Sequence, residues 1–479
     1  MLRTTKPKWS NRIASVAFLL ATPPLCAQTI DTISMRAHTR FLASDLLEGR
    51  GTGTRGEHVA AAYIMSALMR MGAQPFDGKS FLQAIPLKRA TIDHAGTTAR
   101  LNGVTYQSAR DFVWNMGGRR GLRSFSGPLL YVGTGDSVAV RRAGEARGRV
   151  VVMTAAAMAS AANTYIPALI RAGAAGVVLL APEQAYFDLY VTSRGDARYF
   201  TDADVHDPVW QADLPVIIAG PTLVTAIVPA TRPARFTMLH DTLRVTFAAA
   251  LKDVRSANVA GVMRGSDAAL ASEYVVFTAH YDHLGIGPPD ARGDSIYNGF
   301  SDDAAGVAML LAIGDVFRRE PPARSVLFLF FSGEERGLLG STYFASHPPI
   351  PLAQIRALIN LDAGAPPAAP LGWRIAGGAA SSLGEIAERA LAARGWTAQL
   401  GGASPNSDYW PFLQRGVPAI FIIPGDQWEG VSAEQRTTLN ARWNRYHRAD
   451  DEFAEDFPFV GLQRYAEVAL TVGRAVAGR

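Results

Sequence analysis

The chain has 479 residues, of which 48% are hydrophobic and 19% charged, which is the composition of a globular protein. Its formal net charge of +5 comes mainly from the first 27 residues, which hold four of the 47 basic residues and none of the 42 acids. Without that segment the chain is close to neutral, so its net charge says little about binding to nucleic acid or to a membrane surface.

Residues 1–27 have the pattern of a secretory signal peptide. A basic head precedes the apolar run Ile13–Ala21, and a cleavage point follows Ala27. That run is too short to span a bilayer. The residues before Cys26 do not form a lipobox, which disfavours a lipid anchor there. Since Cys26 is the only cysteine, we expect a mature protein without disulfides, located in the periplasm or outside the cell.

Residues 28–115 are predicted to be the first part of the main domain. They contain helical patterns over Ile33–Leu42 and His58–Gly72. The loop between them carries Gly51, Gly53 and Gly56 at the spacing of a nucleotide-binding fingerprint. Such a fingerprint follows a strand, whereas a helix precedes it here, so we interpret the segment as a flexible loop.

Residues 116–250 differ in composition and are predicted to be a separate, β-rich module inserted into the main domain. Short apolar strand patterns recur around residues 128–133, 148–156, 177–181, 214–220 and 242–251, with one helical pattern over residues 165–176. No cluster of ligand-type residues falls in this block.

Strand and helix patterns alternate through the last part of the chain, residues 251–479. The expected strands are Tyr274–Ala279, Val326–Phe331, Ile355–Leu361 and Pro418–Ile423, and the expected helices are Asp303 to about Arg318 and one from about Gly461. This alternation predicts an α/β fold with three αβα layers and a mostly parallel, mixed central sheet.

Polar residues follow three of these strands. His280 and Asp282 follow the first, Glu334 and Glu335 the second, and Asp362 the third. In open α/β sheets ligands bind outside the carboxyl ends of the strands. Each residue alone has a structural interpretation, such as a helix cap or a turn. Together, acids crowded at one rim would repel one another unless a cation lay among them.

A further acidic pair, Asp302 and Asp303, lies at a predicted helix start. Imidazole and carboxylates without thiolate suit zinc in a catalytic site, and a bridging carboxylate would allow two ions. If Glu335 binds metal, Glu334 is left to move a proton.

The set gathered at these strand ends lacks a second histidine ligand. His283 and His347 are alternatives, but we favour His447, which is polar and follows the last strand. Asp282 could hold the ring of His280 in place, because ligand histidines usually donate their other N–H to a carboxylate. Tyr446 could donate a hydrogen bond to a developing oxyanion.

At these residues the chain resembles the co-catalytic di-zinc aminopeptidases, metallopeptidase family twenty-eight, whose clan also holds glutamate carboxypeptidase and the transferrin receptor. The matching segments are "AHYDHLGIG", "GDSIYNGFSDDAAG", "FFSGEERGLLGSTYF", "INLDAG", "SDYWPFLQRGVPAIF" and "RYHRADDEF", with "FLASDLLEGRGTGTRG" near the start. The inserted block resembles a protease-associated domain.

The resemblance implies roles for individual residues. Asp302 would bridge two zinc ions, with His280 and Asp362 completing one site and Glu335 and His447 the other. Glu334 would be the general base and acid, and Tyr446 would polarise the scissile carbonyl. Asp282 and Asp408 would lie behind the ligands or in a subsite. Three departures, Ser301 before the acids, Tyr409 where a histidine is common, and a missing proline after His447, remove no ligand.

The function implied is that of an exported zinc-dependent exopeptidase that acts on peptide or protein N-termini, without nucleic-acid or membrane partners. A carboxypeptidase and a glutaminyl cyclase with a single zinc are alternatives on the same fold, and a metal-free receptor-like relative is a third. An insertion at residues 425–444 is expected to shape the substrate mouth.

Overall fold

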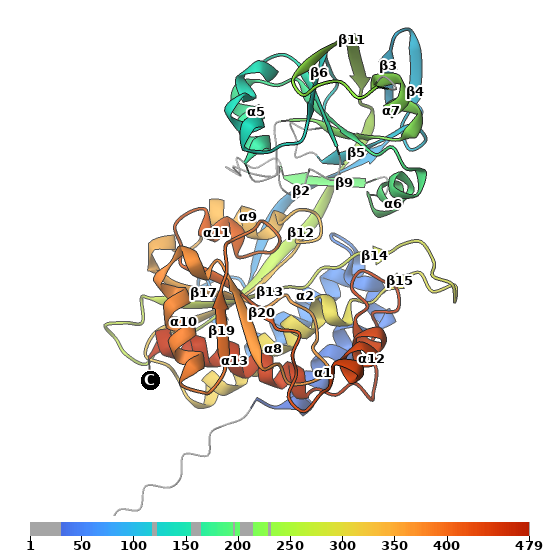
Figure 1. Ribbon diagram of the computed structural model, residues 1–479. Helices are drawn as coiled ribbons and strands as arrows, with labels where there is room; N and C mark the ends of the chain where they lie inside the picture. Colours follow the sequence, from blue (N-terminus) through green and yellow to red (C-terminus); the bar gives the residue numbers. More distant parts are fainter. Residues whose placement is uncertain are drawn as a thin grey trace, which may run out of the picture.

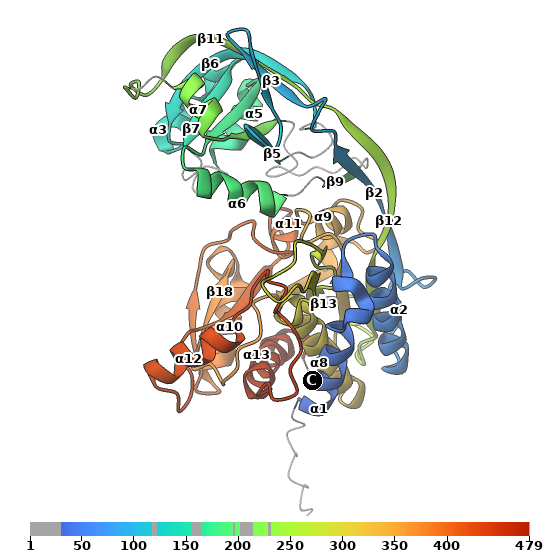
Figure 2. The ribbon, with the colours of Figure 1, turned by 90° about the vertical axis from the view of Figure 1, so that its right-hand side faces the viewer.

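The computed structural model describes residues 30–116, 122–154, 164–194, 197–201, 214–228 and 231–478. The predicted signal peptide lies outside the described residues. The chain forms two domains, each built on its own sheet, and two long strands run between them (Figures 1 and 2). Within the described part of the chain, no helix combines the length and apolar character needed to cross a bilayer.

The larger domain contains a ten-stranded mixed sheet with the strand order β19-β18-β20-β17-β13-β16-β12-β2-β9, and β1 pairs with β12. The four central strands β20, β17, β13 and β16 are parallel, and the outer pairs are mainly antiparallel. The strands are β1 (Gln74–Pro75), β2 (Leu82–Ile92), β9 (Ala197–Thr201), β12 (Ala249–Met263), β13 (Tyr274–His280), β16 (Ser325–Phe331), β17 (Ile355–Asn360), β18 (Gly372–Ala376), β19 (Thr397–Leu400) and β20 (Ala419–Pro424).

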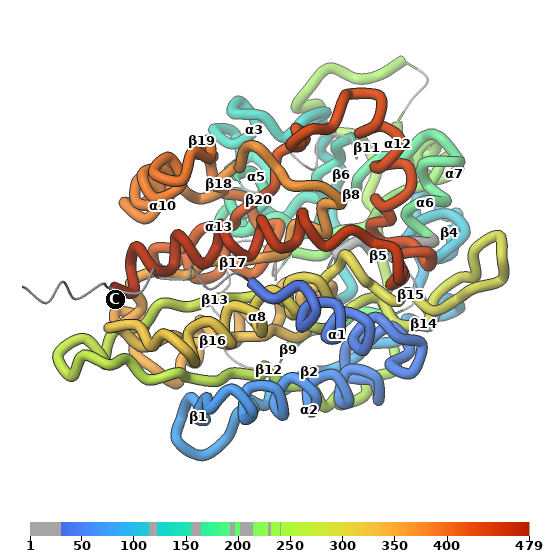
Figure 3. Tube along the Cα trace, turned by 90° about the horizontal axis from the view of Figure 1, so that it is seen from below, coloured from blue at the N-terminus to red at the C-terminus, as the bar shows by residue number. Residues whose placement is uncertain are grey.

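Helices cover both faces of this sheet. One face carries α1 (Thr32–Leu42), α2 (Arg55–Arg70), α8 (Ala305–Arg319), α10 (Ser382–Ala392) and α13 (Val460–Ala477), and the other carries α9 (Leu339–Ser346) and α11 (Trp410–Leu413). Figure 3 shows α8 lying between α13 and α1 on this face. The predicted three-layer αβα fold is therefore confirmed.

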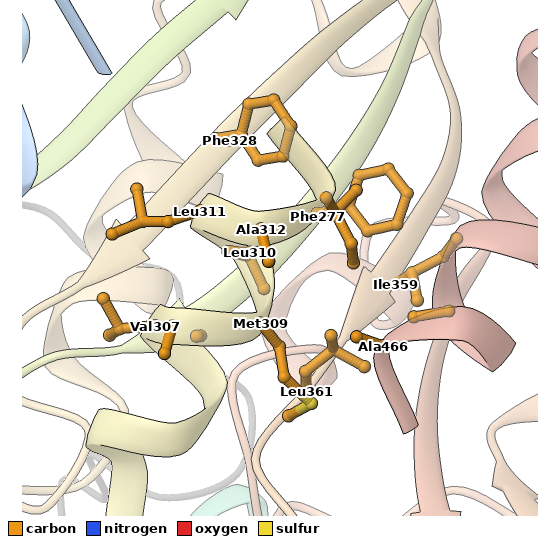
Figure 4. Packing of buried hydrophobic residues seen from close by; sticks show 14 of the residues in the cluster. Phe277, Val307, Met309, Leu310, Leu311, Ala312, Phe328, Ile359, Leu361 and Ala466 are labelled. Atoms are coloured by element: carbon orange, nitrogen blue, oxygen red, sulfur yellow. The ribbon is translucent and has the colours of Figure 1, made fainter. Parts of the chain in front are cut away.

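Side chains along the central strands alternate between the two cores. In β13, Val275 and Phe277 pack on the α8 side while Val276 packs on the α9 side. Neighbouring β16 behaves alike, with Phe328 on the first side and Leu327 on the second. Successive side chains of a strand point to opposite faces, so a continuous apolar run is what a strand buried on both faces requires. Figure 4 shows the α8 side of this packing.

The α13 helix packs closely on this core at Gly473. A Cβ at this position would lie 2.3 Å from Cζ of Phe277. We expect Gly473→Ala to cost about 1–3 kcal/mol through overpacking, against about 1 kcal/mol gained in helix propensity, so the free energy of unfolding should fall. Urea unfolding would measure it, with Gly402→Ala, which has open space around it, as the control. An unchanged midpoint for Gly473→Ala would contradict this packing.

The smaller domain has an eight-stranded sheet with the order β4-β3-β11-β6-β7-β8-β10-β5. Its strands β6, β7, β8 and β10 are parallel, so the domain is α/β rather than only β-rich. The elements are β3 (Thr98–Leu101), β4 (Val104–Gln107), β5 (Phe112–Met116), β6 (Phe125–Gly133), α3 (Ser137–Arg141), η2 (Ala143–Ala146), β7 (Val150–Thr154), α5 (Tyr165–Ala172), β8 (Gly176–Leu180), α6 (Gln184–Arg194), β10 (Val216–Ala219), α7 (Pro221–Ile227) and β11 (Thr237–Thr246).

The domain boundary predicted at residue 116 needs correction. The strands β3, β4 and β5 lie before that residue and belong to the smaller sheet, whereas β9, from the middle block, joins the larger sheet beside β2. The sequence pattern of a strand indicates that it pairs but does not indicate its partner, and β3 pairs with β11 far along the chain. The smaller domain therefore begins soon after β2.

Short elements complete the larger domain. They are η1 (Asp45–Arg50), β14 (Gly285–Ile286), β15 (Ile296–Tyr297), η4 (Phe300–Ala304), η5 (Leu352–Gln354), η6 (Gly378–Ala380) and α12 (Ala433–Trp443). The helix α12 begins at a capping box formed by Ser432 and Gln435, which satisfies two backbone N–H groups at its start.

Candidate metal centre

The carboxyl ends of three neighbouring parallel strands meet at one edge of the larger sheet. His280 is the last residue of β13, which lies between β16 and β17. Glu334 and Glu335 follow β16, and Asp362 follows β17. Because the three strands are adjacent and parallel, their ends deliver these side chains to the same place.

Asp302 lies at the middle of this group. Its Oδ1 is 2.9 Å from Nε2 of His280, and its Oδ2 is 3.0 Å from Nε2 of His447. The same nitrogen of His280 is 3.2 Å from Oδ1 of Asp362, and that of His447 is 3.3 Å from Oε2 of Glu335. The structure thus brings all five predicted ligands together, with one carboxylate facing both histidines. That they bind metal stays a prediction.

Two more residues reach the same place, and sequence reasoning left them out of the ligand set. His283 has Nδ1 at 2.7 Å from Oε1 of Glu335, and Asp303 joins His280 and Asp362 in a group whose ligand atoms all lie within 4.8 Å. Their adjacency to predicted ligands, in "HYDH" and "SDD", was the signal that could have included them. Asp303 also accepts a hydrogen bond from the N–H of Gly306, as expected of a helix cap.

Two buried polar atoms at the centre, Nε2 of His283 and Oδ2 of Asp303, have no hydrogen-bond partner within the described residues. An unpartnered buried polar atom is costly, so such a set in one place calls for a ligand. Nitrogen and carboxylate oxygen donors without sulfur suit catalytic zinc, so the residues present fit the metal.

The electrostatics point the same way. Burial would raise the pKa of Asp302, but hydrogen bonds with His280 and His447 outweigh it and hold that pKa well below its usual range. Burial raises the pKa of Asp303 and of Glu334 well above theirs. Without an ion, protonated histidines balance the negative charge of the carboxylates. Burial lowers the pKa of His447, but the nearby carboxylates have the larger effect and raise that pKa to about 10. A divalent cation would take over that role from protons.

Zinc binding should therefore release protons. With a pKa of about 10, His447 of the metal-free protein carries a proton at pH 7, whereas a ligand imidazole must be neutral. The apparent zinc affinity should rise as pH increases from 7 towards 10, about tenfold per pH unit for each proton released. Calorimetric titration at pH 7 in buffers of different ionisation enthalpy measures the released protons. Binding heats that do not depend on the buffer would contradict the expectation.

The predicted catalytic residues face the same cavity. Its volume is about 660 Å³, and Glu334 and Tyr446 both line it beside His280, Asp302 and Asp362. The ring of Tyr446 stacks on that of His447 with the centroids 3.8 Å apart, and the residue is 64% exposed. Glu334 therefore has room beside it for water and substrate, and the tyrosine hydroxyl stands at the rim.

The insertion at residues 425–444, which we expect to shape the substrate mouth, lines part of this cavity. Trp428, Trp443 and Asn440 line it from the insertion, together with residues 363–367, which follow β17. This part of the lining is thus made by α12 and the loop before it.

The second layer differs in part from prediction. Nδ1 of His280 lies 3.0 Å from the backbone carbonyl of Asp282 and 3.8 Å from its carboxylate, so the carbonyl rather than the carboxylate is in hydrogen-bonding range. The carboxylate instead accepts from the N–H of Glu334 at 3.2 Å. Asp408 is fully buried, which raises its pKa to about 8, and it does not line the cavity. Its neighbour Ser407 donates to Asp362, a contact that sequence reasoning missed.

The glycine-containing segment before α2 is not a flexible loop, so that interpretation is wrong. Gly51 forms an isolated bridge with His283, and Arg50 is only 1% exposed. Glycine and small polar residues are typical of loops, but here they permit close packing of backbone against the metal centre.

A three-layer α/β fold with histidines and carboxylates paired at one sheet edge is the arrangement of a metal-dependent hydrolase. Residues 258–472 match the sequence model of Peptidase family M28. The matched region contains all the candidate ligands and the central strands of the larger sheet.

Known relatives agree with this assignment. The chain is 34% identical over 109 residues to a "Probable zinc metalloprotease" of Pyrenophora teres f. teres (strain 0-1), which covers 23% of each. It is 27% identical over 216 residues to a "probable leucine aminopeptidase 2" of Aspergillus oryzae, covering 40% of this chain and 39% of the relative. The alignments thus span less than half of either curated relative.

The fold extends beyond the matched region. The structure resembles the solved "Aminopeptidase from Aneurinibacillus sp. strain AM-1" with a TM-score of 0.56 and 17% identity, over 94% of this chain and 95% of that one. At this level of identity the likeness concerns the fold, and it includes both domains.

Proposed function

We propose that the protein is an exported exopeptidase that binds two zinc ions and releases N-terminal residues from peptides. The observation that carries this proposal is the position of Asp302, whose two oxygens face His280 and His447 separately, with Glu334 lining the cavity beside them. A carboxylate shared in this way suits two ions about 3.5–4 Å apart.

The residues of the chain would divide the chemistry among them. His280 and Asp362 would hold one zinc ion, Glu335 and His447 the other, and Asp302 both. Zinc, when bound, supplies Lewis acidity toward the scissile carbonyl and the attacking water. Glu334 would take a proton from that water and give it to the leaving amine, a task that suits the raised pKa of a buried carboxyl. The hydroxyl of Tyr446 would donate to the developing oxyanion.

Removal of the metal should abolish activity reversibly. After dialysis against a chelator, we expect hydrolysis of aminoacyl-nitroanilides to fall to background, because Glu334 alone does not polarise the carbonyl, and to return when zinc is added. Zinc content measured on the same samples should rise to two ions per chain in step with activity. Full activity in zinc-free protein would refute the proposal.

The substrate screen separates the alternatives on the same fold. An aminopeptidase cleaves free peptides and spares N-acetylated ones, whereas a carboxypeptidase cleaves N-acetylated peptides and spares peptides with an amidated C-terminus. Cyclisation of N-terminal glutamine with one zinc per chain would instead indicate a glutaminyl cyclase. The cavity volume of about 660 Å³ lies in the range of small-ligand sites and suits one or two residues of a peptide end rather than a long chain.

The proposal extends to the other parts of the chain. Residues 1–27 would be cleaved during export to the periplasm or the medium, and the smaller domain would be a protease-associated domain. The partners of the whole protein would be peptide substrates, not nucleic acids or membranes. Mass determination of the exported protein would test cleavage after Ala27.

A further inference from the structure

One arginine outside the matched family region reaches the metal centre from the N-terminal part of the chain. Arg50 is 1% exposed, and each of its five N–H groups donates to a backbone carbonyl. The acceptors are Leu42 at 2.5 Å, Asn298 at 2.6 Å, Tyr281 at 2.9 Å, Gly299 at 3.0 Å and Asp302 at 3.4 Å.

Four of these five acceptors belong to the two segments that carry the central candidate ligands, and the fifth, Leu42, ends α1. Tyr281 follows His280 directly, and the loop from Asn298 to Asp302 ends in the carboxylate that faces both histidines. One guanidinium thus joins the end of β13 to the loop before α8. Because five donors act from one rigid plane, the spacing of the two segments is determined by the side chain.

The backbone around Arg50 is shaped for this approach. Gly49 has a φ of +66°, and Arg50 itself has a φ of +49°, which is unusual for a residue with a side chain. A Cβ at Gly49 would lie 2.4 Å from the carbonyl oxygen of Tyr297 and 2.6 Å from that of Gly285. Left-handed backbone and contact this close place the guanidinium among its acceptors.

A second side chain of the same segment reaches the other ligand-bearing loop. The hydroxyl of Thr52, which is 2% exposed, donates to Oδ2 of Asp282 at 2.7 Å. The other oxygen of Asp282 accepts from the N–H of Glu334 at 3.2 Å. Thr52 therefore supports the turn that carries Glu334 and Glu335, as Arg50 supports Asp302.

We propose that Arg50 and Thr52 are positioning residues of the metal centre, which hold its ligand-bearing loops in the geometry that zinc requires. The inference rests on the proposed zinc site. Neither residue touches the candidate ligands' metal-facing atoms, so they would act through the loops: Arg50 on the Asp302 loop and the end of β13, Thr52 on the turn after β16.

The test is zinc affinity of the metal-free full-length protein, measured by competition with a fluorescent chelator. The variants are Arg50→Lys, which keeps the charge but has three donors instead of five, and Thr52→Val, which removes only the hydroxyl. The matched controls are Arg324→Lys and Thr39→Val. Arg324 directly precedes β16, at the sheet edge opposite the metal centre, and donates to Glu273 and to the carbonyl of Val476. The hydroxyl of Thr39 is buried and donates to a carbonyl within α1.

We expect the affinity of both test variants to fall by about 10–100-fold, the usual cost of losing a partner behind a ligand, with the controls unchanged. Circular dichroism would establish folding before titration. Wild-type affinity in either folded test variant would overturn the inference, and Thr52→Val alone decides if Arg50→Lys does not fold. Equal losses in the controls would also overturn it. A wild-type protein that binds no zinc would instead refute the proposed function.

Discussion

Replacement of Glu334 by glutamine is expected to lower kcat by about 10²–10⁴-fold while zinc content stays at the wild-type level. Glutamine keeps the size and the hydrogen-bonding reach of the side chain but accepts no proton. The five candidate ligands do not include Glu334, which lines the cavity beside them. The loss should therefore appear in kcat rather than in metal binding.

The measurement is steady-state kinetics with zinc analysis on the same preparation. Glu429→Gln serves as the control, because Glu429 pairs with Arg464 and does not line the cavity. We expect it to retain wild-type kcat. If Glu334→Gln kept activity within about threefold of the wild type, the assignment of the general base would be wrong, since such a change is far below the usual contribution of one.

Asp302→Ala should remove zinc as well as activity. The side chain is 5% exposed and faces the nitrogens of both candidate ligand histidines, so its loss takes a shared ligand from both positions. We expect activity to fall by more than about 10²-fold, because loss of a partner behind a ligand already costs 10–100-fold. Zinc content should fall below the wild-type value even with zinc in the buffer.

Another buried acid gives the matched control for this variant. Asp315 is 8% exposed, lies within α8 and pairs with Arg70 on the surface of the domain. Asp315→Asn should leave zinc content and kcat unchanged. Normal zinc content in Asp302→Ala would show that Asp302 is not a ligand. His283 and Asp303, the other residues gathered there, would then be the first alternatives.

The elements and the site were predictable where the signal is local. Each central strand is an apolar run buried on both faces, and the polar residue after it is set at the sheet edge by the end of the strand. His280, Glu335 and Asp362 follow from that rule alone. The choice of His447 needed more, because it lies in an irregular segment, and its placement there agrees with the resemblance to a family.

The rest could not be predicted because it depends on contacts between distant segments. Arg50 donates to backbone carbonyls as distant in the sequence as that of Asp302. No sequence periodicity identifies a side chain whose partners are backbone atoms. The flexible-loop interpretation failed for this reason. The predicted start of the smaller domain was wrong for a similar reason. The sequence of β3 has strand character, but only its pairing with β11 assigns it to a sheet.

The central claim is that the acids at this sheet edge lie together because two divalent cations lie among them. Anomalous diffraction at the zinc absorption edge, from crystals of the protein grown without a chelator, tests it most directly. We expect two peaks, one between His280 and Asp362 and one between Glu335 and His447, with Asp302 in contact with both. A map without peaks at these positions, from protein that is active on peptides, would contradict the account.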